Sequence, residues 1–461
     1  MSLWTRDEAV AATGGKSPVD WAANGVSIDT RTLEKGDLFV ALSATRDGHD
    51  FVAQALENGA SAALVSRIPE GLEGAPLLLV PDVLKGLEAL GMAARARTHA
   101  RVIAITGSVG KTGSKEMLRV ALQGQGNIHV AEKSYNNHEG VPLTLARMPR
   151  DTEIAVIEIG MNHAGEIAPL ARMARPHVAL ITTVAPVHLA AFNSVAEIAA
   201  EKAEIFKGLV PDGIAVLNGD IETYPILAKA APAQILRFGQ GKGCDFRLAS
   251  CEVGKGATVV RAESPMGEIM FKLGGEGVHL AQNAVGVLAG LYALKADLGR
   301  ATLALASWQP PEGRGARQQI PLGPEGMDGH FTLINESYNA NPASTRAALE
   351  TLAQQAGRKV AILGDMLELG ETAAALHNAL AKLEGIDIIH TVGPLMAAVP
   401  FENRGLTADS AEVLAAQIGR QIRAGDVVMV KGSLGMKMAK IIDALANLSD
   451  AESQQNPEGK T

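Results

Sequence analysis

The sequence has little cysteine, no long apolar run and no secretory start, and each shortage excludes a class of protein. Two cysteines in 461 residues, Cys244 and Cys251, are too few for a disulfide-stabilised scaffold, and we interpret both as structural. No apolar stretch is long enough to span a bilayer. The first residues lack the basic start and apolar core of a signal peptide. We therefore expect a cytoplasmic protein without an integral membrane segment.

The sequence also lacks a block of basic residues. Its formal net charge at pH 7 is -8. Nucleic acid is held mainly through neutralisation of its phosphates, so we expect no nucleic-acid partner. An anionic substrate would have to be bound by individual lysines and arginines.

The length and composition predict a globular α/β protein of several domains, because a single core stops growing well below 461 residues. Apolar runs alternate with helical patterns in three successive regions. The boundaries lie near 97–101 and in the Pro- and Gly-rich segment 308–315, which we interpret as a hinge. The predicted domains are 1–98, 99–315 and 316–461.

The expected strands differ in character from one region to the next. The first region has short strands at 37–42, 61–65 and 76–80. The second has near-continuous apolar runs, typical of parallel strands buried on both faces, at 102–106, 154–159, 178–184 and 214–218. An antiparallel meander is expected at about 245–273. The third region has strands at 358–363, 387–392 and 426–430, each followed by a glycine and a helix, as in a doubly wound fold.

The segment TGSVGKT at 106–112 is the strongest motif. It lies between an apolar run and a helical segment, which is the setting of a phosphate-binding loop. Lys111 would then reach the β- and γ-phosphates, and the Thr112 hydroxyl would face a magnesium ion. Only Gly107 and Gly110 of the usual glycines are present, because Ile105 stands where the first would be. The alternative is a tight turn with an exposed lysine.

Polar residues also occur where parallel strands end, which is where such sheets bind ligands. Glu158 interrupts an apolar strand, and a bound metal ion or a salt bridge would offset the cost of burying its carboxylate. Asn162 and His163 follow it and either contact a ligand or form the turn. His188, after the next strand, is expected at the same edge as Thr112 and is either structural or a ligand.

Lys202 lies in an unusual place. The helix expected at 194–206 has Ser194 as its cap and an apolar stripe in which Lys202 occupies one position. Glu201 and Glu204 lie off that stripe. A lysine on the packed side either snorkels, pairs with a carboxylate or has been chemically modified.

Several further segments occur in an order that resembles the Mur ligase family over essentially the whole chain. They are SYNNHEGVPLTL at 134–145, EIGMNHAGEI at 158–167, ESYNANP at 336–342 and GDMLELG at 364–370. The resemblance is closest to members that add D-alanyl-D-alanine to UDP-N-acetylmuramoyl-tripeptide. It implies a three-domain architecture: an N-terminal UDP-sugar-binding domain, a central P-loop domain that binds ATP, and a Rossmann-like C-terminal domain. It also implies ATP-dependent amide formation through an acyl phosphate, in peptidoglycan precursor synthesis.

The resemblance also implies roles for individual residues. Those expected at ATP are Gly107, Ser108, Val109, Gly110, Lys111, Thr112, Asn283, Arg314 and Glu336. Two magnesium ions are expected, one on Thr112 and Glu158 and the other on His188 and a carbamylated Lys202. The catalytic set is Lys111, His188, Lys202 and Arg314. The residues expected to bind the other substrates are Asp29, Thr30, Arg31, Asp47, Gly48, His49, Asn136, Asn137, Asn339 and Asn341.

Two positions depart from the family pattern. Gly113 stands where a hydroxyl residue is usual, and Asn335 where an aspartate is common. Two alternatives stand beside the main hypothesis. One is another ligase of the superfamily, such as the third-residue-adding ligase or folylpolyglutamate synthase, against which the segments YNANP and GDMLELG stand. The other is a nucleotide-binding protein without catalysis, for which Gly113 is the only hint. We expect a monomer. The sequence leaves open whether the tripeptide ends in diaminopimelate or lysine.

Overall fold

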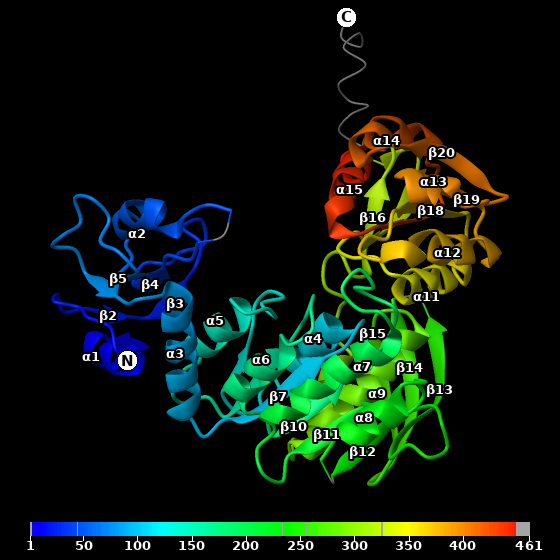
Figure 1. Cartoon of the computed structure of the whole chain (residues 1–461). Helices are drawn as coiled ribbons and strands as arrows, with labels where there is room; N and C mark the ends of the chain where they lie inside the picture. Colours follow the sequence, from blue (N-terminus) through cyan, green and yellow to red (C-terminus); the bar gives the residue numbers. More distant parts are fainter. Residues whose placement is uncertain (1, 44, 233, 255, 324–325, 449–461) are drawn as a thin grey trace, which may run out of the picture.

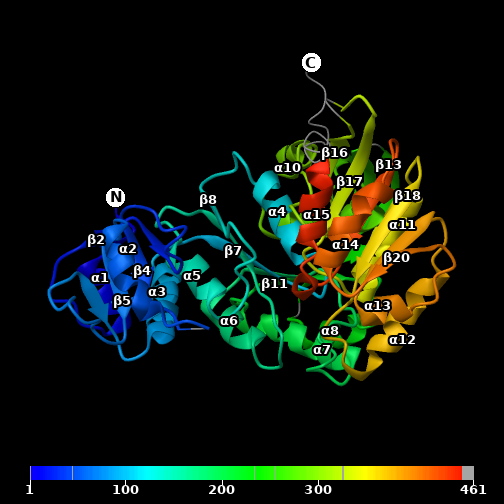
Figure 2. The ribbon, with the colours of Figure 1, turned by 90° about the horizontal axis from the view of Figure 1, so that it is seen from above.

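The computed structural model of the chain describes residues 2–43, 45–232, 234–254, 256–323 and 326–448. It has three α/β units, each built on its own main sheet, with the middle unit between the other two (Figures 1 and 2). The three-domain α/β architecture predicted from the sequence is therefore present. Each main sheet lies inside one of the ranges 1–98, 99–315 and 316–461, whose limits stay a proposal.

The N-terminal unit is a small parallel sheet with helices packed on it. Its strands, in order across the sheet, are β3 (Gly25–Ser27), β4 (Asp37–Val40), β5 (Ala62–Val65) and β6 (Leu77–Leu79). Its helices are α1 (Arg6–Thr13), α2 (Val52–Glu57) and α3 (Val83–Ala96), with a short 3-10 helix η1 (Gly48–Phe51) before α2. Two short strands precede β3 in the chain, β1 (Trp4–Thr5) and β2 (Ala22–Ala23). They pair with each other and form a separate two-stranded antiparallel sheet.

The middle unit contains a nine-stranded sheet in the order β15-β14-β13-β12-β11-β10-β7-β9-β8. The parallel part comprises β7 (Arg101–Thr106), β8 (Ile128–Val130), β9 (Ile154–Glu158), β10 (Val178–Ile181), β11 (Ile214–Asn218) and β12 (Ile235–Gly239). The predicted antiparallel meander is confirmed as β13 (Phe246–Gly254), β14 (Ala257–Ser264) and β15 (Gly267–Gly274).

Helices cover both faces of the middle sheet, as expected for a doubly wound fold. One face packs against α4 (Lys111–Ala121), α9 (Val278–Ala293) and α10 (Leu298–Leu305). The other packs against α5 (Gly140–Ala146), α6 (Ile167–Ala174), α7 (Val195–Ala203) and α8 (Tyr224–Ala230). Strand β7 pairs with β9 on one side and β10 on the other, so the chain reverses its direction of winding there. Ligands bind at such a switch point, beyond the carboxyl ends of the strands.

The C-terminal unit is a six-stranded sheet in the order β16-β17-β21-β18-β19-β20, parallel except for β16. Its strands are β16 (Ala316–Pro321), β17 (His330–Glu336), β18 (Lys359–Gly364), β19 (Ile388–Val392), β20 (Arg404–Ala408) and β21 (Val427–Lys431). Its helices are α11 (Pro342–Ala353), α12 (Ala373–Asn378), α13 (Pro394–Ala398), α14 (Ala411–Ile418) and α15 (Ala439–Ala446).

The apolar runs identified some strands and missed others. In the C-terminal unit they predicted β18, β19 and β21, which are central, but not β16, β17 or β20. Strands β16 and β20 form the two edges of that sheet and expose much of their length, so they carry polar residues rather than a continuous apolar run. The middle unit likewise contains β8 and β12, which were not predicted.

Two predicted elements end earlier than expected. The strand expected at 178–184 ends at Ile181, because the next residues turn towards the phosphate loop: Ser108 N–H donates to the Thr183 carbonyl over 2.8 Å. Helix α7 begins after the predicted cap, Ser194, whose hydroxyl accepts from Glu197 N–H. It ends at Ala203 and continues as the 3-10 helix η2 (Glu204–Gly208).

Cys244 and Cys251 are free thiols. Among the helices of the described residues, none has both the length and the apolar character needed to cross a membrane.

The N-terminal and middle units share a buried polar junction. The Trp4 indole N–H donates to the Ala146 carbonyl over 2.9 Å. Arg95, on α3, is 3% exposed, and its guanidinium donates to the carbonyls of Ala174 and Arg175 over 2.8 and 3.0 Å. These carbonyls belong to the end of α6, where a cation is also favoured by the helix dipole. The junction therefore ties α3 to α6, one of the helices that pack on the middle sheet.

We expect Arg95→Met to lower the free energy of unfolding by about 1–3 kcal/mol, because it leaves buried carbonyls without donors. Denaturant titration followed by circular dichroism measures this. Arg172→Met is the matched control, since Arg172 is exposed on α6, the helix whose end Arg95 contacts, and makes no hydrogen bond within the described residues. Equal stability of the two variants would contradict the expectation.

Candidate functional site

A cavity of about 410 Å³ lies where the carboxyl ends of the middle sheet meet the C-terminal unit. It is lined by residues from both units, and most of the predicted site residues are among them. These are Ser108, Val109, Gly110, Lys111, Thr112, Asn136, Asn137, Glu158, His188, Asn283, Arg314, Glu336, Asn339 and Asn341. The structure thus brings together residues that lie more than 200 positions apart.

The phosphate loop joins β7 to α4 through two glycines with positive φ, Gly107 at 152° and Gly110 at 90°. A Cβ at Gly107 would lie 2.0 Å from the Thr182 hydroxyl oxygen, and one at Gly110 would lie 2.8 Å from the Asn283 amide. Both positions therefore require glycine for space as well as for conformation. The Ser108 hydroxyl bonds to Ala185, which fastens the loop to the segment after β10.

Lys111 is the first residue of α4, and its ammonium group folds back to donate to the Gly107 carbonyl over 2.5 Å. Burial lowers the pKa of Lys111; nearby Glu158 raises it, and the Arg314 guanidinium lowers it further. Two cations thus face the same space, one from α4 and the other from the hinge segment 308–315. An anion bound there would relieve their repulsion.

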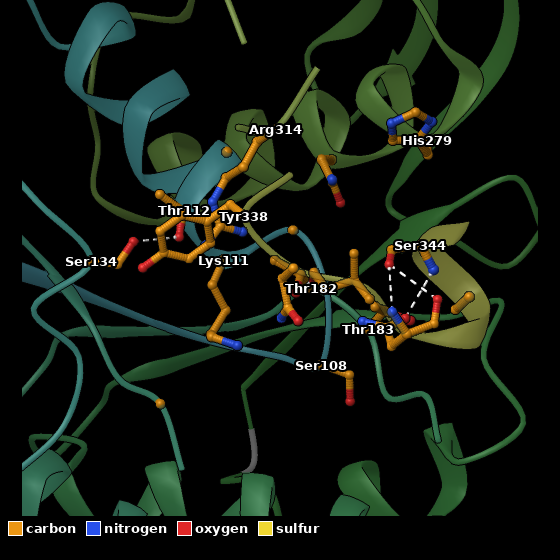
Figure 3. Close-up of a pocket in the computed structure, with 18 of the residues that line it drawn as sticks. Ser108, Lys111, Thr112, Ser134, Thr182, Thr183, His279, Arg314, Tyr338 and Ser344 are labelled. Atoms are coloured by element: carbon orange, nitrogen blue, oxygen red, sulfur yellow. Dashed lines mark hydrogen bonds between the residues drawn. The ribbon is translucent and has the colours of Figure 1, made fainter. Parts of the chain in front are cut away.

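Glu158 and Thr112 form the centre of a small hydrogen-bond cluster. The Thr112 hydroxyl donates to Glu158 Oε1 over 3.1 Å, and the Asn136 amide donates to the same oxygen over 2.8 Å. Ser134, joined to Thr112 in Figure 3, lies 3.1 Å from its hydroxyl. Glu158 Oε2 is buried and has no hydrogen-bond partner among the described residues, and no salt bridge to Glu158 is found there.

This cluster is chemically suited to magnesium. A carboxylate oxygen without a donor and an adjacent hydroxyl are hard oxygen ligands. Within the described residues no group of three or more His, Cys, Asp or Glu side chains is arranged to hold a metal. Magnesium often binds through one or two carboxylates and the phosphates of its substrate, so the residues present fit such an ion.

Lys202 is buried at 1% exposure, as its position on the apolar stripe predicts, and it does not line the cavity. Burial lowers its pKa well below the usual value, and the nearby Lys111 ammonium lowers it further, whereas Glu201 opposes the shift. No ion pair to Lys202 is found in the described part of the chain.

The placement of Glu201 off the packed stripe was wrong. Its side chain is buried at 7% exposure, and its carboxylate accepts from the backbone N–H groups of Gly165 and Ile167 over 2.9 and 3.0 Å. These donors are at the start of α6, where unpaired N–H groups favour an anion. The helical period did not reveal this partner because it lies on another helix.

His188 lies at the cavity in a left-handed backbone conformation, with φ of 54°. Its Nδ1 is 2.6 Å from a carboxylate oxygen of Glu368, which belongs to the C-terminal unit. Asn162 lines the cavity too. His163 is exposed and pairs with Glu166, so it belongs to the turn.

The hinge segment 308–315 and the C-terminal unit supply another part of the cavity wall. The Arg314 guanidinium lies 4.3 Å from the centre of the Tyr338 ring, and both appear beside Thr112 in Figure 3. Tyr338 N–H also donates to the Gly313 carbonyl, which holds the ring beneath the hinge segment. Buried Lys431 donates to Glu336 Oε2 and to the Asn339 carbonyl, each over 3.0 Å. This pairing orients the Glu336 carboxylate.

The remaining C-terminal positions have structural contacts as well. Asn341 caps α11 by accepting from Ser344 N–H over 2.9 Å. The Asn335 amide oxygen accepts from Ser337 N–H and its hydroxyl, so it shapes the loop that carries Tyr338.

The predicted residues of the N-terminal unit are not brought to this cavity. Arg31 pairs with Asp29, which lowers the pKa of that carboxyl to about 2. Asp47 caps η1 by accepting from His49 N–H, and this bond, together with those from Arg67 and the His49 ring, lowers its pKa. His49 is itself buried and accepts from Ser66 N–H. The role of 29–31 and 47–49 in binding stays a prediction.

Several cavity residues were not predicted. They are Ser134, Thr182, Asn218, His279, Gln282, Tyr338 and Lys431. Ser134 and Tyr338 lie in the segments 134–145 and 336–342, which carry the family resemblance. Assigning a binding role to more of the polar residues in these segments would have included both. Lys431 is a charged residue at the end of an apolar strand, β21. Glu158 was identified as a candidate because it occupies the same kind of position in β9. His279 lies in the first turn of α9, the helix that carries Asn283.

Three family models match the chain and together cover most of it. Residues 23–98 match the Mur ligase family catalytic domain, residues 105–291 the Mur ligase middle domain, and residues 325–434 the Mur ligase glutamate ligase domain.

Whole proteins resemble the chain along nearly its full length. UDP-N-acetylmuramoyl-tripeptide--D-alanyl-D-alanine ligase of Rickettsia prowazekii is 31% identical, over 96% of this chain and 99% of that protein. A crystal structure of MurF from Acinetobacter baumannii has 30% identity and a TM-score of 0.84, covering 96% of this chain and 99% of that one. MurF ligase from Thermotoga maritima, in complex with ADP, has 26% identity and a TM-score of 0.77, covering 93% and 98%.

Gly113 provides a test of the phosphate loop. It lines the cavity on α4, and a Cβ there would have no neighbour within 4 Å. We expect Gly113→Ser to lower the KM for ATP roughly two- to tenfold through one added hydrogen bond, while acceptor KM values barely move. Steady-state kinetics measures both.

Gly74→Ser is the matched control, because it too adds a side chain in open space but lies in the N-terminal unit. Unchanged ATP kinetics in Gly113→Ser would show that the missing hydroxyl is neutral and that the loop backbone alone binds phosphate.

Proposed function

The chain belongs to the Mur ligase family, and we propose that it is the ATP-dependent ligase that joins D-alanyl-D-alanine to UDP-N-acetylmuramoyl-tripeptide in peptidoglycan precursor synthesis. The observation that carries the proposal is the cavity itself. There the phosphate loop and the Thr112–Glu158 pair of the middle unit face Arg314 and Glu336 from the C-terminal side. The full-length similarity to D-alanyl-D-alanine ligases supports this choice of substrates.

The proposed reaction forms an amide through an acyl phosphate. The terminal carboxylate of the tripeptide attacks the γ-phosphate of ATP and releases ADP. The amine of D-alanyl-D-alanine then attacks the acyl carbon, and phosphate leaves. Two anions must approach each other in the first step, so positioning and charge neutralisation account for most of the catalysis.

The residues of the cavity suit these tasks. The loop from Gly107 to Thr112 turns its backbone N–H groups and the start of α4 towards a phosphate chain. Lys111 and Arg314 both line the cavity and would neutralise the transferring phosphoryl group. Asn283 and Glu336 would bind the adenine and ribose sides of the nucleotide.

Two magnesium ions are part of the proposal, and they would neutralise phosphate charge and help orient the transferred group. Thr112 and Glu158 would hold one ion, since Glu158 Oε2 has no donor in the described residues. His188 and Lys202 would hold the other. Lys202 is suited to this as a carbamate, because an ammonium group has no lone pair to donate and magnesium prefers oxygen ligands to a neutral amine.

The carbamate is supported by the surroundings of Lys202. Burial and the neighbouring Lys111 both favour the neutral amine, which is the form that reacts with carbon dioxide. The nitrogen attacks the carbon of carbon dioxide and releases one proton, leaving a carboxylate at the end of the side chain. That anion would be a hard ligand for magnesium and would make the local charge negative.

The other substrates are assigned by the family resemblance. We propose that Asp29, Thr30, Arg31 and the segment 47–49 bind the UDP-linked substrate, with Asn136 and Asn137 on the middle unit. Asn339 and Asn341 would lie near the dipeptide. The proposal includes a monomer, because one chain contains all three units, and a cytoplasmic location, where ATP is available.

Phosphate release in the presence of each acceptor tests the function. With ATP, magnesium and UDP-N-acetylmuramoyl-tripeptide, we expect release to depend on D-alanyl-D-alanine. Diaminopimelate with the shorter dipeptide precursor, and glutamate with a folate, are the controls for the rival ligases. The proposal would be refuted if phosphate were released with diaminopimelate or with glutamate and their respective substrates, or if no phosphate were released with any acceptor. Tripeptides ending in lysine and in diaminopimelate should be compared to identify the third residue.

Lys202→Ala tests the carbamate. We expect it to reduce ligation by at least about a hundredfold, because a metal ligand is lost, while binding of the UDP-linked substrate is unchanged. Small carboxylic acids added to this variant should restore part of the activity. Turnover and substrate binding are measured separately, by phosphate release and calorimetry.

The two failures of this test have different meanings. Full activity of Lys202→Ala would show that the side chain is not needed. Loss of activity without rescue by carboxylic acids would favour an ammonium paired with a carboxylate or a phosphate instead.

A further inference from the structure

The loop after β18 in the C-terminal unit reaches the middle unit at one point. Glu368 Oε2 is 2.6 Å from His188 Nδ1, and Ala190 N–H donates to the Glu368 carbonyl over 3.2 Å. The two residues are 180 positions apart. Glu368 lies in the segment GDMLELG, to which the proposed mechanism gives no task.

Both partners have unusual backbone conformations. His188 has φ of 54° and Glu368 has φ of 64°, although neither is glycine. Such residues are strained by roughly 1–3 kcal/mol and persist where their surroundings hold them. Next to them a Cβ at Gly370 would lie 3.1 Å from the Leu189 carbonyl oxygen, so the two loops approach closely. The backbone conformations of both loops therefore favour this contact.

The contact determines which nitrogen of His188 is available. The 2.6 Å contact to a carboxylate oxygen favours the tautomer in which Nδ1 carries the proton and donates it to Glu368. Nε2 then keeps its lone pair, and no hydrogen bond to Nε2 is found in the described part of the chain. Since His188 lines the cavity, its surroundings are those of a metal-binding histidine oriented by a carboxylate.

We propose that Glu368 is a positioning residue that orients His188 for the metal–nucleotide complex, and that it does so only while the C-terminal unit is docked on the middle unit. This inference rests on the proposed function. It makes docking and metal binding interdependent, because the orienting carboxylate comes from one domain and the ligand from the other. By thermodynamic linkage, binding of metal and nucleotide must then favour docking to the same extent.

Three variants distinguish the orientation of His188 by the Glu368 carboxylate from a general disturbance of the loop that carries Glu368. Glu368→Ala removes the carboxylate, and Glu368→Gln keeps an acceptor of the same length without charge. Glu371→Ala is the matched control, because Glu371 is an exposed carboxylate three residues on with no hydrogen bond in the described residues. Glu368 itself is 62% exposed, so its loss leaves the core intact.

Binding of Mn²⁺, used as a paramagnetic substitute for Mg²⁺, is measured by electron paramagnetic resonance in the presence of ADP. We expect Glu368→Ala to weaken Mn²⁺ binding about 10- to 100-fold. Glu368→Gln should have a smaller effect, and Glu371→Ala none. The affinity for ADP in the presence of EDTA should be the same in all four proteins, because the phosphate loop is untouched.

Two further measurements test how the effect is transmitted. In a His188→Ala background, Glu368→Ala should cause no additional loss, because it acts through His188. Small-angle scattering should show that Mn²⁺ and ADP compact the wild type more than Glu368→Ala.

Wild-type Mn²⁺ affinity in Glu368→Ala, or additive effects of the two substitutions, would overturn the inference and leave the proposed function standing. If the wild type binds ADP no better with metal than without, the proposed function itself fails.

Discussion

The close approach of the phosphate loop to its neighbours constrains the whole site. Gly107 leaves no room for a side chain beside Thr182, and Gly110 leaves none beside Asn283. The loop is thereby held between the end of β10 and helix α9, and the Ser108 hydroxyl fastens it there. A side chain at either position would force the loop or its neighbours to move, so this arrangement of the cavity depends on the two glycines.

The site also contains buried charged groups that lie close together. Lys111 and Lys202 lie within electrostatic range of each other, and burial lowers the pKa of both. Glu158 accepts hydrogen bonds on one oxygen only. These groups do not neutralise one another in ion pairs within the described residues, as a purely structural cluster would. The arrangement is suited to a charged ligand that completes it.

The two outer units are joined to the middle unit in different ways. The N-terminal unit is fastened by packed helices and by buried donors such as Trp4 and Arg95. The C-terminal unit follows a Pro- and Gly-rich segment and meets the middle unit through polar contacts, among them Glu368 with His188 and Arg317 with Glu276. The Glu368 side chain is 62% exposed, so its contact can be broken and remade in water at little cost, whereas Glu276 is buried and its pair with Arg317 holds the two units together more firmly.

Features that depend on local order could be predicted from the sequence. The glycine spacing identified the loop at 106–112, continuous apolar runs identified the central strands, and the helical period placed Lys202 on the packed face. The contacts of the polar groups became visible only in the folded chain: Glu201, on α7, accepts hydrogen bonds from the start of α6, and Glu368 contacts His188. The physical reason is that hydrophobic periodicity reports which face of an element is buried, whereas a hydrogen-bond partner on another element depends on how the elements pack.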